Sequence, residues 1–360
     1  MQHTLSRARV DIDLGALQRN GAALARRAGV PLLPMIKADA YGLGVKEVRE
    51  TLESLDPWGY GVATVREGQE LRSLGVMRPI VVFTPLLEED LSPALAARIT
   101  PTLGFPHEIR AWQKAGGGPW HLSIDTGMSR AGIPWREISS IGKLVQSMTP
   151  EGAFTHFHSA ELDDGTMKAQ ESAFRTAIAE LPTRPRYLHT DNSAAIARRA
   201  RSEWDLIRPG IFLYGVGSGP GADIQPEAVV HVRAPVVEIR RLQPGDTVSY
   251  DATLRVDRES LIATLAIGYA DGYPRALSGV GTALVRGSFA PIAGRVTMDM
   301  TMIDVTTVSC EVGDVATLIG RDGDVVLTVE RVADDAGMSP YEVLTGLRSR
   351  VERSYTRGQG

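Results

Sequence analysis

The sequence predicts an α/β fold: a (β/α)8 barrel of the TIM type, followed by a mainly β C-terminal domain. Short apolar runs alternate with segments of helical periodicity, which is typical of a parallel sheet. Eight such units fit into about 200 residues, and this count favours a closed barrel over an open sheet. Beyond the glycine-rich stretch 215–227 the hydrophobic period shortens to two residues, which indicates a separate domain of strands.

Eight apolar or β-branched runs are expected to form the barrel strands. They are "LLPMIK" (32–37), "WGYGVAT" (58–64), "IVVF" (80–83), "ITPTL" (99–103), "WHLSID" (120–125), "EGAFTHF" (151–157), "RYLHTD" (186–191) and "DLIRPGIFLYG" (205–215), the last fading into a turn. Segments of helical pattern lie between them at 45–55, 65–75, 107–116, 166–181 and 193–200. The first domain is therefore expected to cover residues 1–225.

The second domain, residues 226–360, is predicted from four segments with the period of strands. These segments are 229–256, 261–274, 282–305 and 314–320, with Gly and Asp turns between them. A helical segment at 328–347 follows. The first ten or so residues of the chain are candidates for packing on this β domain rather than on the barrel.

Composition excludes several classes of function. The 360 residues include 39 basic and 43 acidic residues, a net charge of -4 without a run of either sign, so neither nucleic acid nor a membrane is expected as a partner. Cys310 is the only cysteine, and the N-terminus lacks the apolar core of a secretion signal, which favours the cytoplasm. No stretch approaches the roughly 20 apolar residues of a membrane span. No metal site is predicted.

Polar residues gather at the carboxyl ends of the expected barrel strands, where this fold places its functional groups. In chain order they are Lys37, Asp125, Arg130, His156, Asn192, Ser193 and Arg208, and Gly210 and Ile211 follow Arg208. Singly, each has an ordinary explanation, such as a surface lysine, a core histidine, a helix-capping serine or an ion-paired arginine. Together, a desolvated amine beside anion-binding groups is what a Schiff base with pyridoxal phosphate (PLP) requires.

Seven motifs carry a resemblance to the bacterial alanine racemases over nearly the whole chain. They are "MIKADAYGLG" (35–44), "DTGMSRAG" (125–132), "HTDNSAA" (189–195), "IRPGIFLYG" (207–215), "VSYDATL" (248–254), "IGYADGYPR" (267–275) and "GRVTMDM" (294–300), in the family's order. Any one of them could mislead, but seven together are highly specific. The resemblance implies a PLP-dependent interconversion of L-alanine and D-alanine that supplies D-alanine for peptidoglycan.

The resemblance also implies a cofactor site. Lys37 matches the lysine that forms the Schiff base with PLP. The positions that hold the cofactor phosphate match Tyr41, Ser193, Gly210, Ile211 and Tyr341. Arg208 matches the residue that faces the pyridine nitrogen. Because a guanidinium has donors only, that nitrogen must accept a hydrogen bond and stay unprotonated.

Racemisation removes a proton from one face of the α-carbon and returns it to the other, so a base is needed on each side. Lys37 and Tyr250 match the family's catalytic pair, although Tyr250 alone would be read as an ordinary strand aromatic. In the family this tyrosine comes from the partner chain, which implies a homodimer with shared active sites. His156 matches the residue that links the tyrosine toward Arg208, an arrangement that could lower a phenol pKa.

The resemblance further places substrate-binding groups. Arg130 and the backbone at Met298 match groups near the substrate carboxylate. Tyr269 and Asp299 match the entrance, and Asn192 is expected to support the site. One position departs from the pattern: seven residues before Arg130, where many members carry a carbamylated lysine that orients the arginine, this chain has Ser123. A bound anion such as chloride, water or a neighbouring side chain is expected to hold Arg130 instead.

Three alternatives compete with this interpretation. A PLP-dependent decarboxylase shares the architecture, but its cysteine-containing motif is missing, since Cys310 lies in "TTVSCEVGD". A non-catalytic PLP carrier would lack the second domain that supplies Tyr250. A racemase of serine or of a broader amino-acid set stays open, because pocket size depends on residues that the sequence cannot place. His158 is expected to be a loop residue without a role.

Overall fold

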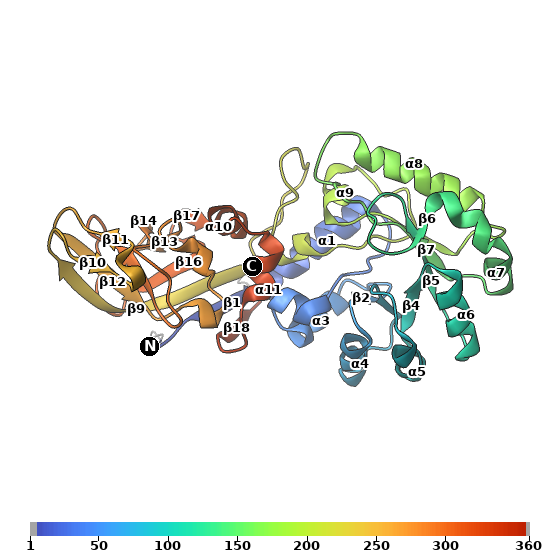
Figure 1. Cartoon of the computed structure of the whole chain (residues 1–360), viewed down its shortest axis with the longest axis horizontal. Coiled ribbons are helices and arrows are strands. Elements are labelled where there is room, and N and C mark those ends of the chain that lie inside the picture. Colours follow the sequence, from blue (N-terminus) through green and yellow to red (C-terminus); the bar gives the residue numbers. More distant parts are fainter. Residues whose placement is uncertain (1–5, 358–360) are drawn as a thin grey trace.

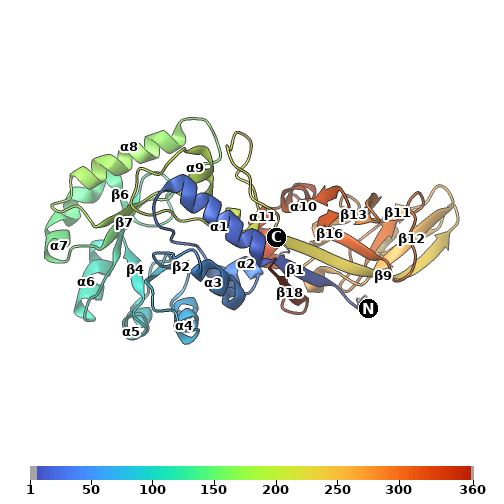
Figure 2. The ribbon, with the colours of Figure 1, turned by 180° about the vertical axis from the view of Figure 1, so that it is seen from behind.

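The computed structural model describes residues 6–357, and these residues form two lobes side by side along the long axis of the molecule (Figure 1). The barrel lies at one end and the mainly β domain at the other, and the view from behind shows the same separation (Figure 2). One cluster of buried hydrophobic side chains continues through both lobes. The predicted fold class is therefore confirmed.

Six of the barrel strands form regular parallel ladders. In sheet order they are β2 (Tyr60–Val62), β3 (Ile80–Val82), β4 (Thr100–Leu103), β5 (His121–Asp125), β7 (Gly152–Phe154) and β8 (Tyr187–His189), with the short β6 (Ile133–Pro134) paired to β5. All six lie within the predicted runs. In the runs 151–157 and 205–215, only some of the residues pair with a neighbouring strand.

The first and eighth runs pair only through isolated bridges, Leu32 with Ile207, residue 35 with residue 61, and residue 192 with residue 208. The amide of Leu33 donates to the carbonyl of Ile207 over 2.8 Å, so these bridges close the barrel. Pro34 and Pro209 lie in these two segments. Proline has no backbone N–H, which interrupts a continuous ladder and explains why only bridges form here.

Helices cover the outside of the barrel. They are α1 (Leu14–Ala28), α3 (Val45–Glu53), α4 (Val65–Ser73), α5 (Glu88–Ala96), α6 (Pro106–Lys114), η1 (Trp135–Ile141), α7 (Gly142–Ser147), α8 (Thr166–Ala179) and α9 (Ser193–Arg198). The five helical segments expected from the sequence are present among them. Helix α1 begins where the carboxylate of Asp13 accepts a hydrogen bond from the amide of Ala16.

The second lobe is built on a nine-stranded sheet with the order β14-β13-β16-β9-β1-β18, and with β12, β15 and β17 off this path. Its strands are β1 (Arg9–Asp13), β9 (Val230–Leu242), β12 (Ser260–Leu265), β13 (Thr282–Val285), β14 (Ser288–Pro291), β15 (Thr301–Asp304), β16 (Val315–Asp322), β17 (Val325–Leu327) and β18 (Glu352–Thr356). A separate hairpin joins β10 (Thr247–Val248) to β11 (Leu254–Arg255). Helices α10 (Val329–Ala336) and α11 (Pro340–Gly346) follow β17.

Strand β1 ties the start of the chain to the second lobe. It pairs antiparallel with β9 and parallel with β18, and its buried side chains Val10 and Ile12 join the shared core. Residues 1–5, part of the segment expected on the β domain, lie outside the described residues. Among residues 6–357, no helix is long and apolar enough to cross a membrane.

Candidate active site

A cavity of about 580 Å³ opens at the carboxyl ends of the barrel strands. Most of the residues predicted for the site line it, namely Lys37, Tyr41, Ser123, Arg130, His156, Asn192, Ser193, Arg208, Gly210, Ile211 and Tyr341. The structure thus brings together groups that are up to 304 positions apart in the chain (341 minus 37). Tyr341 comes from α11 of the second lobe, so both lobes contribute to the cavity.

Lys37 begins α2 (Lys37–Gly42), a turn with left-handed backbone. Residues 38–41 all have φ between 53° and 58°, although none of them is glycine. A non-glycine residue in this conformation costs roughly 1–2 kcal/mol, so the surroundings must hold the turn. The Asp39 carboxylate accepts from the amide of Val45 at 2.7 Å, and the Glu67 carboxylate accepts from the amide of Ala38 at 2.7 Å.

The two glycines of this motif are required by close neighbours. Gly42 has φ of +84°, and a Cβ there would lie 2.8 Å from the Leu344 carbonyl oxygen. Gly44 has φ of +93°, and its Cβ would lie 2.1 Å from the hydroxyl of Tyr355. The motif therefore forms a strained turn that packs closely against the second lobe. That turn places Lys37 at the cavity.

Lys37 is half-buried, and its pKa is lowered by burial and then by the nearby Arg130 guanidinium, while Glu67 opposes the shift. A lower pKa increases the fraction of neutral amine, which is the nucleophilic and proton-accepting form. Arg130 itself is exposed. Within residues 6–357 it has neither a hydrogen bond nor an ion pair, and so none with Ser123, which also lines the cavity.

Backbone amides and hydroxyl groups come together in one group of cavity residues, to which we give the name anion cradle: Ser193, Gly210, Ile211, Tyr41 and Tyr341. The Ser193 hydroxyl accepts from the amide of Gly210 at 2.9 Å. Ile211 begins the 3-10 helix η2 (Ile211–Tyr214), so its amide has no partner within that helix. A Cβ on Gly210 would lie 2.6 Å from the Tyr41 hydroxyl. The glycine is what lets this phenol approach the backbone amides.

The tyrosine rings of the cradle are held by stacking. The ring of Tyr41 stacks on Tyr214 with centroids 4.5 Å apart, and lies 6.0 Å from the ring of Tyr341. Burial raises the pKa of Tyr41 well above its usual range, so its hydroxyl is a hydrogen-bond donor rather than a base. Asn192 caps helix α9, its side chain accepting from the amide of Ala195 at 3.0 Å.

Arg208 is 4% exposed, and the protein satisfies both terminal nitrogens of its guanidinium. One nitrogen donates to Nδ1 of His189 at 2.8 Å and to the His189 carbonyl at 2.6 Å. The other donates to the carbonyls of Thr155 at 2.8 Å and Thr190 at 3.1 Å. Nε is left without a partner among the described residues, and Arg208 lines the cavity. The site therefore offers one donor to an acceptor in the cavity.

His156 follows β7 and is partly buried at the cavity wall. Burial lowers the pKa of His156 to about 3, and the cations Arg208, Arg130 and Lys37 lower it in that order. The imidazole is therefore neutral at physiological pH. His158, two residues on, is exposed, and its Nδ1 lies 2.7 Å from the hydroxyl of Ser159.

Four predicted site residues lie in the other lobe and not in this cavity. Tyr250 belongs to η3 (Tyr250–Ala252) in the β10–β11 hairpin, at the end of the molecule away from the barrel (Figure 1), and it is 68% exposed. Met298 is 52% exposed, and its carbonyl accepts from Ala270 next to Tyr269. Asp299 pairs with Arg350. One chain alone does not bring Tyr250 to Lys37.

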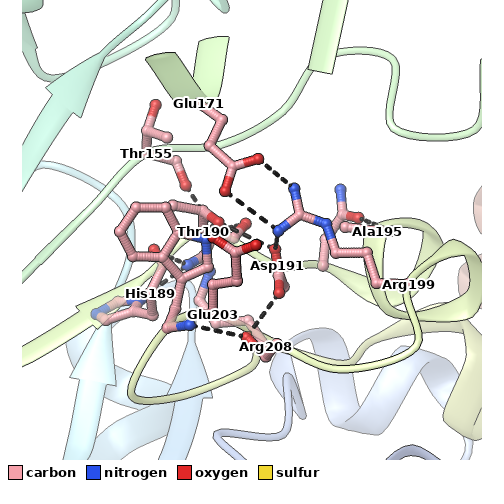
Figure 3. Close-up of polar contacts among 12 residues, drawn as sticks. Thr155, Glu171, His189, Thr190, Asp191, Ala195, Arg199, Glu203 and Arg208 are labelled. Atoms are coloured by element: carbon pink, nitrogen blue, oxygen red, sulfur yellow. Dashed lines mark hydrogen bonds and ion pairs between the residues drawn. The ribbon is translucent and has the colours of Figure 1, made fainter. Parts of the chain in front are cut away.

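Three buried polar residues behind the cavity were not among the sequence candidates: His121, His189 and Asp191. Asp191 is fully buried, accepts from the Ser202 hydroxyl at 2.7 Å and pairs with Arg199 at 3.1 Å (Figure 3). Arg199 continues to Glu171 at 2.6 Å. The only signal in the sequence is a polar residue inside or directly after an apolar strand, as in "WHLSID" and "RYLHTD".

Known proteins of one family are similar to most of this chain, in both lobes. The family described as "Alanine racemase, N-terminal domain" matches residues 12–218, and "Alanine racemase, C-terminal domain" matches residues 229–355. The alanine racemase of Citrifermentans bemidjiense is 37% identical, covering 96% of this chain and 98% of the relative. That of Deinococcus radiodurans is 38% identical, covering 97% and 99%.

A solved structure gives the same result. The alanine racemase from Bartonella henselae with covalently bound pyridoxal phosphate superposes with a TM-score of 0.91 at 30% identity, covering 98% of this chain and all of the other. Both lobes, in the same order, are therefore shared with these enzymes. The chain belongs to the alanine racemase family.

Proposed function

We propose that the protein is a PLP-dependent alanine racemase that interconverts L-alanine and D-alanine, with Lys37 and the partner chain's copy of Tyr250 as its two bases. It acts in the cytoplasm as a homodimer and supplies D-alanine for peptidoglycan. The observation that carries the proposal is the cavity in which Lys37, an anion cradle and the free Nε of Arg208 face the same space.

The donor set of the cavity fits PLP. A phosphate needs several donors in a concave site, and the cradle offers the Ile211 amide together with the hydroxyls of Ser193, Tyr41 and Tyr341. A pyridine nitrogen needs one donor if it stays unprotonated, and Arg208 has one to give. A carbonyl carbon needs a neutral amine, which the lowered pKa of Lys37 supports. When bound, PLP withdraws electrons from the α-carbon of the amino acid and makes its proton more acidic.

Lys37 then holds or accepts a proton at Nζ on one side of the substrate. Arg130 is the exposed cation of the cavity next to Lys37, and it is suited to the substrate carboxylate because its guanidinium has no protein anion to neutralise it within residues 6–357. His156, neutral at physiological pH, can accept or donate a hydrogen bond toward an incoming phenol without adding another cation.

A second base must come from elsewhere. The Tyr41 phenol lies in the cavity, but its raised pKa makes it a poor base. Tyr250 and Met298 are 68% and 52% exposed on the other lobe, so both side chains are free to contact a partner. A dimer in which this surface covers the cavity of the partner would supply the phenol and exclude water at once. This is the basis for proposing shared active sites.

The test uses the purified protein with its cofactor. Borohydride should fix PLP covalently on Lys37, and peptide mapping should find the label there. Label on another lysine, or none, would contradict the assignment. Lys37→Ala should abolish racemisation while the cradle still retains some PLP. Turnover of L-alanine, L-serine and L-lysine by one preparation decides between a strict alanine racemase and one for serine or a broader amino-acid set.

A further inference from the structure

Two buried histidines connect Arg208 to the amino end of the barrel. Nδ1 of His189 lies 2.8 Å from a terminal nitrogen of Arg208, and Nε2 of His189 lies 2.8 Å from Nδ1 of His121. Both histidines are 0% exposed. In the strand register His189 lies beside Phe154, which lies beside Ser123, whereas His121 lies beside Gly152. The contacts from Arg208 through His189 to His121, which we call the histidine string, therefore descend by one layer of the barrel interior.

The rings have little freedom to move. His189 stacks on Phe154 with ring centroids 5.2 Å apart and an angle of 3° between the planes. His121 lies 5.7 Å from the ring of Trp58, and a Cβ on Gly152 would come within 2.7 Å of the imidazole of His121. A fixed ring also fixes the direction in which each nitrogen points.

Chemistry then assigns every proton in the string. A guanidinium can only donate, so Nδ1 of His189 must accept and its proton sits on Nε2. That proton points at Nδ1 of His121, which must also accept, so the proton of His121 sits on its own Nε2. The nearest carboxylate to this end is Glu151, whose Oε2 lies 3.9 Å from Nε2 of His121, beyond hydrogen-bond distance.

Adding a proton to either ring would turn one of these contacts into two donors facing each other. The string is therefore neutral and has one direction, from Arg208 through His189 to His121. Burial, followed by the charge of Arg208, lowers the pKa of His121 to about 3, and the same two causes lower that of His189. The charged groups that face the string are Arg208 at one end and Glu151 at the other.

We propose that His121 is a positioning residue for the racemase: through His189 it fixes the guanidinium of Arg208 so that Nε alone points into the cavity. The inference rests on the proposed function. The guanidinium of Arg208 also lies over the aromatic rings of Phe154 at 5.2 Å and Phe83 at 5.8 Å. Contact with the two ring faces fixes the plane of the guanidinium but not its rotation within that plane. His189 Nδ1 sets this rotation together with three backbone carbonyls, and it is the only side-chain acceptor among the four. His121 keeps that acceptor from turning over.

The test compares two substitutions at one site. His121→Phe keeps a ring of similar size but removes the acceptor for His189, which leaves a buried N–H unpaired. His121→Asn places an amide oxygen near the position of Nδ1 and restores that acceptor. Trp120→Phe is the matched control, because Trp120 is 1% exposed and adjacent on the same stretch of chain but takes no part in the string.

In the holoenzyme we expect His121→Phe to lower kcat roughly tenfold, the cost of one unmade buried hydrogen bond, with KM for alanine nearly unchanged. The absorption of the bound cofactor should also become pH-dependent. His121→Asn should recover most of kcat, and Trp120→Phe should retain it. Nitrogen NMR of labelled histidine should find His121 and His189 neutral, with the proton on Nε2, from about pH 5 to about pH 9.

Equal kcat for the parent and His121→Phe, or equal losses in the Phe and Asn variants, would overturn the proposal. A proton on Nδ1 of His189 would overturn it as well. The NMR measurement needs no turnover. If the parent binds PLP but does not racemise alanine, the proposed function fails while the histidine string can still be confirmed or refuted.

Discussion

Lowering the pH from 7.5 to 5.5 should destabilise the fold through His121 and His189. Both are fully buried and both have a pKa below the usual value of a histidine, to about 3 for His121. In the unfolded chain their pKa returns to roughly 6.5, so the unfolded state binds more protons in this range. A group whose pKa is lower in the folded protein than in the unfolded chain stabilises the fold fully above its pKa in the unfolded chain. This stabilisation is lost as the pH falls toward its pKa in the folded protein.

The magnitude follows from this linkage. Between pH 7.5 and 5.5 a group with an unfolded pKa of about 6.5 and a folded pKa near 3 changes the free energy of unfolding by about 1.4 kcal/mol. His189 and His156, whose pKa values burial also lowers, add to this loss. Asp191 and Glu151 oppose this loss, because burial raises the pKa of each carboxyl. The parent protein alone therefore does not isolate the histidines.

The assay measures the difference between the parent and His121→Asn, using urea unfolding at a fixed protein concentration and following tryptophan fluorescence. The loss of stability between the two pH values should be smaller in the variant by about 1.4 kcal/mol. His158→Asn is the control, since His158 is exposed and should leave the loss unchanged. The same pH dependence in the parent and in His121→Asn would refute a neutral, buried His121.

Two further predictions concern the cavity. Gly210→Ala should raise the Kd for PLP roughly 10- to 100-fold in a fluorescence titration, because the new Cβ lies 2.6 Å from the Tyr41 hydroxyl and displaces a phosphate donor. Gly142→Ala is the control, since no atom lies within 4 Å of its Cβ, and it should leave the Kd unchanged. Equal Kd values for the two variants would contradict the anion cradle. Replacing chloride by gluconate at constant ionic strength should raise KM for alanine, because Arg130 lies near the Lys37 amine and has neither a hydrogen bond nor an ion pair within residues 6–357. Ser123→Lys should lower KM. Indifference to chloride would mean that a side chain or water orients Arg130.

Much of the barrel could be predicted from the sequence because its strands are buried on both faces and appear as short apolar runs. The prolines at 34 and 209 did not hide the first and eighth runs, although they limit the pairing there to bridges. Most cavity residues from the barrel were predictable because they follow those runs, whereas Tyr41 and Tyr341 were expected only from the resemblance to the racemases. Strand order then brings them to one rim without further information.

Other features left no readable signal. The left-handed turn after Lys37 runs against the preference of four non-glycine residues, and contacts with Glu67 and the second lobe hold it. His121 and His189 look like ordinary core histidines in an apolar strand, because their function depends on a neighbour 68 residues away. Tyr250 lies in the other lobe of its own chain, and its proposed approach to Lys37 is a contact between two chains. No pattern in one sequence encodes that distance.

Each active site is proposed to combine Lys37 of one chain with Tyr250 of another. The direct measurement mixes Lys37→Ala chains with Tyr250→Phe chains, each inactive alone, under conditions where subunit exchange is demonstrated. Random exchange makes half of the dimers mixed, and each mixed dimer has one intact site of two, so about a quarter of the parental racemase activity should return. If exchange is complete and no activity appears, Tyr250 acts within its own chain and the shared site is wrong.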